Sequence, residues 1–277
     1  DFPAVPAYEV ALARLFVSQN RMGEAEERIR SLVARDPDNA DWRVQLADLL
    51  VNQRQSADAE AGLKQAVREH PASGAMRFAL ADFYATNQRP DEALKVYEAV
   101  LAAGPKPEEA LAARNRIVAL TMKTDEKRAR ALVREILADA PANADALVYR
   151  AAFSFKDQRL GEAVADLRSA LVRQPDSQRA LLLLARTYVS KGDAALAEAT
   201  YRRLLALNPA RAEARRELAA VVSGRGDLKA AETLLRDALE FAPGDQTSSS
   251  GLITALMNQG DLKGAEAEAR RMVGLGE

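Results

Sequence analysis

Prolines recur along the sequence at an almost constant interval. Seven of them, from Pro37 to Pro243, follow one another at spacings of 34, 34, 36, 34, 34 and 34 residues. An alanine stands twelve residues before each of these prolines, and Ala265 continues the alanine series past the last one. A fixed period of this length indicates a stack of similar structural repeats and not one globular core.

Each repeat contains two segments with the apolar pattern of an amphipathic helix. In one repeat the first segment covers about residues 180–189 and the second about 196–207. Their apolar residues are three and four positions apart, which places them on one helix face. Gly192 lies where the first segment must end, and Pro209 follows the second. Aromatic residues are only 5% and Ala, Leu, Arg and Glu are abundant, which is typical of an all-α chain.

The period and the alanine pattern resemble the tetratricopeptide repeat (TPR), a helix-turn-helix repeat of 34 residues. The resemblance implies an all-α fold, a right-handed superhelical α-solenoid of about eight helix-turn-helix TPR units that forms one domain over residues 1–277. The repeats are predicted at 6–39, 40–73, 74–107, 110–143, 144–177, 178–211, 212–245 and 246–277, with Glu108 and Glu109 as an insertion. Because Pro3 stands 34 residues before Pro37, we expect the natural protein to continue upstream, and also downstream, of this chain.

Two regions depart from the pattern. Arg116 and Arg150 occupy a position that Leu holds in most of the other repeats. Their aliphatic stems would cover apolar surface while their heads reach solvent, or else they mark a bend or weak joint between Glu108 and Arg150. Residues 248–251, three serines and a glycine, open the first helix of the last repeat, which we therefore expect to be loosely ordered.

Several kinds of chemistry are excluded by composition. His70 is the only histidine and there is no cysteine, so a His-based triad, a multi-His metal site and a thiolate metal site cannot form within this chain. We expect no catalytic residue and no cofactor. The 39 basic and 40 acidic residues give a net charge of −1, so no overall field would draw the chain onto nucleic acid.

The sequence leaves the compartment open. No apolar run is long enough to span a membrane. The absence of cysteine is compatible with a reducing cytoplasm and with an oxidising periplasm. Since the Ala-, Arg- and Leu-rich repeats look bacterial, the alternatives are the bacterial periplasm or envelope and the cytoplasm.

The resemblance also implies where a partner binds. In TPR arrays the first helices of the repeats line a concave face, and positions two, five, six, nine, twelve and thirteen contact the partner. The predicted groove residues at these positions are Arg14, Asp41, Gln45, Asp48, Asn52, Asp82, Arg114, Asn115, Asp145, Tyr149, Lys156, Arg179, Arg186 and Arg216. Those of the first three repeats carry a net charge of −2 and those of the next three +3, which predicts a groove with an acidic and a basic part.

A long surface without convergent titratable groups favours a non-enzymatic protein–protein interaction scaffold that binds a partner peptide or domain in its concave groove. Arg114 and Arg186 would hold a carboxylate of the partner through bidentate hydrogen bonds. The Lys and Asn pair with which some TPR proteins clamp an acidic C-terminus is absent from the opening repeats. The uncovered apolar faces of terminal repeats would also permit self-association.

Two other interpretations stay open. The chain also resembles the repeat regions of bacterial envelope and exopolysaccharide export assemblies, for which Tyr149 and Phe155 would be residues that stack on a glycan. Alternatively, it is the repeat domain of a larger enzyme whose catalytic part lies outside these residues.

Overall fold

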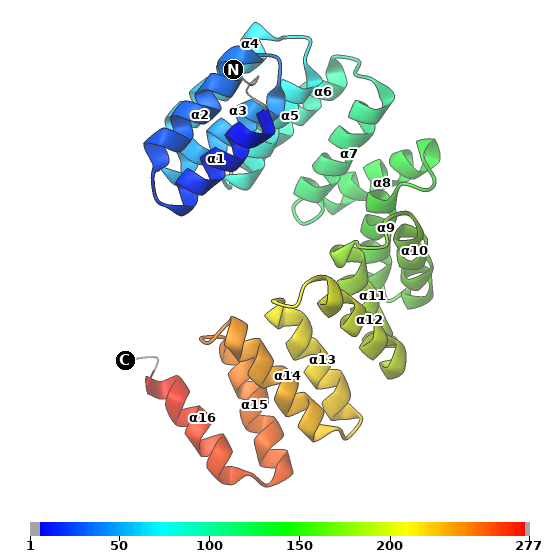
Figure 1. Cartoon of the computed structure of the whole chain (residues 1–277). Helices are drawn as coiled ribbons and strands as arrows, with labels where there is room; N and C mark the ends of the chain where they lie inside the picture. The colour runs from blue at the N-terminus through cyan, green and yellow to red at the C-terminus, as the bar shows by residue number, and fades with distance from the viewer. Residues whose placement is uncertain (1–5, 275–277) are drawn as a thin grey trace. The chain divides into compact units, whose positions relative to one another are not determined.

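The computed structural model describes residues 6–274, and within this range the chain consists of helices without any β-strand (Figure 1). The sixteen helices of the described range are α1 (Pro6–Ser18), α2 (Met22–Arg35), α3 (Ala40–Asn52), α4 (Ser56–Glu69), α5 (Gly74–Thr86), α6 (Pro90–Ala102), α7 (Pro107–Thr121), α8 (Glu126–Asp139), α9 (Ala144–Lys156), α10 (Leu160–Arg173), α11 (Gln178–Lys191), α12 (Ala194–Leu207), α13 (Ala212–Gly224), α14 (Leu228–Phe241), α15 (Gln246–Gln259) and α16 (Leu262–Gly274). They form eight helix-turn-helix pairs, which confirms the predicted fold class.

The chain divides into two compact units at the bond between Leu132 and Val133, inside α8. We call them the N-terminal unit and the C-terminal unit. Within each unit a helix contacts its neighbours in the chain, and first helices of adjacent repeats also touch, as α3 touches α5 and α13 touches α15. Such nearest-neighbour packing is the hallmark of a solenoid. The division falls within the segment from Glu108 to Arg150, and the prediction of one continuous domain stays a prediction.

The periodic alanines lie in the interior of the repeats. Ala25, Ala163 and Ala197 are fully buried, and even Ala265 in the last helix is only 6% exposed. A methyl group is the largest side chain that lets two helix backbones approach closely, which explains why the position repeats alanine. The apolar residue four positions later, for example Tyr201, is buried beside it.

The helix ends follow from local sequence signals. Gly192 ends α11 with a left-handed backbone, φ 80°, as the sequence predicts, and Gly260 ends α15 in the same way with φ 82°. Polar side chains cap the start of five first helices by accepting a hydrogen bond from a backbone N–H, namely Asn39, Ser73, Asn143, Ser177 and Asp245.

The serine-rich start of the last repeat is a regular helix, which corrects the expectation of loose order. The Asp245 carboxylate caps α15 by accepting hydrogen bonds from the backbone N–H groups of Thr247 and Ser248 at 3.3 Å. Ser248 and Ser249 are buried, and the Ser249 hydroxyl accepts a hydrogen bond from Arg271 at 3.1 Å. The small hydroxyl groups are thus satisfied inside the repeat, so they do not disturb the helix.

Candidate functional site

Every predicted groove residue lies on the first helix of a repeat, although the structure gives these residues very different surroundings. Arg14 lies on α1 and Asp82 lies on α5. Helix α3 carries four of the predicted residues: Asp41, Gln45, Asp48 and Asn52. The remaining residues are on α7 (Arg114, Asn115), α9 (Asp145, Tyr149, Lys156), α11 (Arg179, Arg186) and α13 (Arg216).

A cleft of about 230 Å³ lies between α1, α2 and α3, and we call it the α1–α3 cleft. Its rim consists of four polar residues that the sequence predicted for the groove, Arg14, Gln45, Asp48 and Asn52. Its floor is apolar and is formed by Val10, Ala13, Val17, Ala25, Ile29 and Leu49. The structure therefore brings together four of the predicted residues from two adjacent repeats.

The rim side chains have no partners among the residues that the structure describes. None of the four forms a side-chain hydrogen bond or ion pair with another residue of the range 6–274. Partial burial raises the pKa of the Asp48 carboxyl. Arg14 and Asp48 thus contribute opposite charges from two helices to one apolar cleft, and neither charge is neutralised by a neighbour among the described residues.

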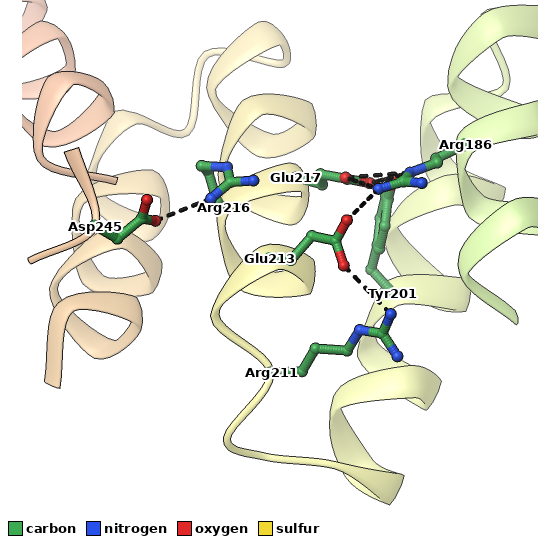
Figure 2. Close-up of polar contacts among 7 residues, drawn as sticks. All are labelled: Arg186, Tyr201, Arg211, Glu213, Arg216, Glu217 and Asp245. Atoms are coloured by element: carbon green, nitrogen blue, oxygen red, sulfur yellow. Dashed lines mark hydrogen bonds and ion pairs between the residues drawn. The ribbon is translucent and has the colours of Figure 1, made fainter. Parts of the chain in front are cut away.

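In the C-terminal unit the corresponding charged residues are bound to one another. Figure 2 shows that Arg186 of α11 contacts Glu213 and Glu217 on α13. The distance from Arg186 Nη2 to Glu217 Oε1 is 2.5 Å. The Tyr201 hydroxyl donates to Glu217 Oε2 at 2.7 Å, and Arg211 contacts Glu213 at 3.3 Å. Burial acts to raise the pKa of Glu217, but the hydrogen bonds from Arg186 and Tyr201 outweigh it, and the pKa is lowered.

This network changes the interpretation of Arg186. We predicted that its guanidinium binds a partner carboxylate, yet two carboxylates of the chain itself occupy it. Arg216 is likewise paired with Asp245 at 2.9 Å (Figure 2). Arg186 is consequently neutralised by two acids of the following repeat, and Arg216 by the residue that caps α15.

Tyr149 is not available for stacking on a ligand, contrary to the prediction. Its side chain is only 6% exposed, and the Arg179 guanidinium lies over its ring at 4.5 Å from the centroid. Arg179 in turn donates to Asp145 at 2.8 Å. The three predicted groove residues therefore form one internal cluster of an ion pair and a cation–π contact.

Arg116 and Arg150, the two arginines at the usual Leu position, are held by carboxylates. Arg116 makes two hydrogen bonds to Asp82, at 2.7 and 3.1 Å, and Arg150 makes two to Asp166, at 2.8 and 2.7 Å. Their heads remain about half exposed, as expected for stems that cover apolar surface. The bidentate geometry explains how the repeats tolerate arginine at this position.

Two sequence-family models with the description "Tetratricopeptide repeat" match the chain. One covers residues 44–108 and 125–178, and the other covers 16–70 and 154–221, so that together they match more than half of the chain. The chain belongs to the tetratricopeptide repeat family. TPRs are generally protein–protein interaction modules, and their fold is typically a non-catalytic scaffold.

Solved structures support the TPR fold. The chain is similar to a chain of the APC/C hetero-tetramer Cut9–Hcn1, with a TM-score of 0.68 and 17% identity over 92% of this chain, although it spans only 49% of that chain. It is also similar to a tetratricopeptide repeat protein from Parabacteroides merdae, with a TM-score of 0.60, 15% identity and coverage of 91% and 98%. MamA gives a TM-score of 0.52 and 19% identity over 55% of this chain and 90% of that one. No curated protein sequence matches the chain.

The TPR positions of the C-terminal unit also line two clefts. One, of about 380 Å³, includes Phe155 and Val189, and the other, of about 410 Å³, includes Ser250 and Thr254; both share Ala220. These small and apolar side chains were missed by the sequence prediction because it selected polar residues, except for Phe155, which it named. The sequence could have indicated them, since they occupy positions of the repeat that the resemblance assigns to the groove.

The described part of this TPR chain offers little for other chemistry. Within residues 6–274 no group of three or more His, Cys, Asp or Glu residues could hold a metal ion. None of the helices in that range is long and apolar enough to cross a membrane. His70, the only histidine of the sequence, is partly buried at the end of α4 and contacts Asp38 at 2.5 Å.

Proposed function

We propose that this chain is a non-enzymatic TPR scaffold that binds a peptide segment of a partner protein on its first helices, with the α1–α3 cleft as a main contact site. The observation that carries the proposal is the rim of that cleft. Four polar side chains without partners among the described residues surround an apolar floor. Binding sites commonly combine apolar walls with a few polar groups that fix orientation.

The rim groups suit a peptide backbone and its side chains. The side-chain amides of Gln45 and Asn52 each offer both a donor and an acceptor, which can pair with the N–H and C=O groups of an extended segment. These two residues lie on one face of α3 with Asp48, because they are separated by three and four positions from it. A bound segment would therefore meet a continuous row of polar groups along α3.

The composition of the rim also supports binding over catalysis. Asp48 is its only carboxylate, and the rim has no hydroxyl, thiol or imidazole group that could act as a nucleophile or as a general base beside it. The glycan-binding export interpretation loses Tyr149 as a stacking residue, since its ring is covered. The export and larger-enzyme alternatives otherwise stay predictions.

Selection of random peptides displayed on phage against the whole chain tests the proposal. We expect enriched peptides that bind the wild-type chain and lose binding to an Asn52→Trp variant, in which the larger side chain covers the cleft. An Arg270→Gln variant is the matched control, because Arg270 is exposed on α16 in the C-terminal unit. Failure to enrich peptides, or equal binding of all enriched peptides to the Asn52→Trp variant, would refute the cleft as a main contact site.

A further inference from the structure

We infer that the α1–α3 cleft selects a peptide in which an apolar side chain is flanked by an acidic residue that meets Arg14 and a basic residue that meets Asp48. The inference rests on the proposed function and adds the chemical class of the segment and its orientation. It depends on one difference between two pairs of opposite charges: Arg14 and Asp48 form no ion pair, whereas Asp145 and Arg179 do.

Arg14 and Asp48 are 34 residues apart, so they occupy the same position in two adjacent repeats. Asp145 and Arg179 are also opposite charges with a separation of 34 residues, and their side chains meet at 2.8 Å. The period therefore brings oppositely charged residues of neighbouring first helices within reach of an ion pair. Arg14 and Asp48 form no such pair, and both line the intervening cleft.

Helix α3 carries further negative charge beyond the residues that line the cleft. Asp41 is exposed and lies seven residues before Asp48, which puts both on the same face of α3. The Asp41 side chain also lacks a partner among residues 6–274. The α1 side has Arg14 on the rim. One basic side chain from α1 and one acidic side chain from α3 thus line the same apolar floor, so the two sides of the cleft carry opposite charges.

A ligand with complementary charges gains most from this arrangement. The floor excludes water once an apolar side chain occupies it, and charge interactions strengthen as the surroundings become less polar. Arg14 can then hold a carboxylate through two parallel hydrogen bonds. A ligand without a cation would cover Asp48 and leave its carboxylate unpaired, which lowers the affinity for the wrong segment.

The experiment uses peptides selected as above on the whole chain and resynthesised with their acidic or basic residues replaced in turn by Gln. For the wild-type chain we expect each replacement to weaken binding about tenfold, as loss of a partly exposed charge pair does. For an Arg14→Gln variant the acidic replacement should have no further effect, and for Asp48→Asn the basic replacement should have none. Glu266→Gln and Arg270→Gln, an exposed pair on α16, are the matched controls.

Three outcomes would overturn the inference. In the first, peptides lose binding to Asn52→Trp, which shows that they require the open cleft, but bind Arg14→Gln and Asp48→Asn as tightly as wild type. This result would leave the proposed function intact and refute the charge selection. Absence of any cleft-dependent peptide would refute both. A double-mutant cycle in urea that couples Arg14 to Asp48 in the free chain would show that the charges already neutralise each other.

Discussion

Glu217 joins three helices of the C-terminal unit, and we predict that its charge stabilises their packing. Its carboxylate accepts hydrogen bonds from Arg186 on α11 and from Tyr201 on α12, while Glu217 itself lies on α13 (Figure 2). A Glu217→Gln substitution keeps the shape and an acceptor for Tyr201 but removes the negative charge. The substitution therefore removes the charge from the hydrogen bonds of both Arg186 and Tyr201 and replaces one of the two oxygens that accept from Arg186.

The expected magnitude follows from the exposure of the pair. A hydrogen bond to a charged group contributes about 1.5–3 kcal/mol, and an exposed ion pair contributes less than about 1 kcal/mol. Arg186 is 40% exposed and Glu217 is 23% exposed, so we expect a loss of about 1–1.5 kcal/mol in the free energy of unfolding. For a domain of this size the loss corresponds to a decrease in Tm of roughly 2–6 °C.

Thermal and urea unfolding followed by far-UV circular dichroism measures this loss, with Glu213→Gln as the control. Glu213 contacts the same Arg186 but is 39% exposed, so its substitution should cost less than about 0.5 kcal/mol. The pKa of Glu217 is lowered in the folded chain, so its stabilisation should be complete above the unfolded value of 4.5 and decrease as the pH falls below it. Equal losses for the two variants, or a pH-independent Glu217→Gln effect, would refute the reasoning.

Three further predictions concern packing, backbone conformation and pH. Ala163→Leu should overpack the fully buried alanine position and cost roughly 1–3 kcal/mol in urea unfolding. Gly192→Ala should destabilise by about 1 kcal/mol because φ is 80°, whereas Gly161→Ala in the first turn of α10, where a Cβ meets nothing within 4 Å, should be neutral or stabilising in the same assay. Hydrogen bonds from Arg89 and Lys64 lower the pKa of Glu60 to about 2, so the difference in Tm between wild type and Glu60→Gln should be constant above pH 4.5 and shrink as the pH falls from 4.5 toward 2.

The fold was predictable from the sequence because its main packing constraint repeats with the period of the chain. A proline after each of the first seven second helices and an alanine at each helix crossing are local requirements, and each can be read without knowledge of the rest of the structure. The same holds for Gly192, whose left-handed conformation favours glycine. Loose order at residues 248–251 was wrongly expected, since helix propensity ignores the cap from Asp245 and burial against the neighbouring helix.

The candidate site was predictable only in part, because the charges were summed over groups of three repeats and opposite charges of adjacent repeats were not paired with each other. The acids that bind Arg186 lie 27 and 31 residues further along, on the first helix of the next repeat. Tyr149 was misjudged for a similar reason, since Arg179, which covers its ring, belongs to the following repeat. A search for opposite charges about one period apart would have detected both clusters from the sequence.

Two opposite charges that are one repeat period apart can either stabilise the packing of adjacent repeats or stay open to a partner. Measurements of the free energy of unfolding distinguish these two roles. Where the side chains meet, as Asp145 and Arg179 do, the pair belongs to the interface between adjacent repeats, and neutralising one member weakens the nearest-neighbour packing of α9 with α11. Where they stay apart over an apolar cleft, as Arg14 and Asp48 do, the same substitution removes no internal contact. Neutralisation should then change partner affinity and leave the free energy of unfolding within about 0.5 kcal/mol of wild type, because surface substitutions without such contacts have effects of that size.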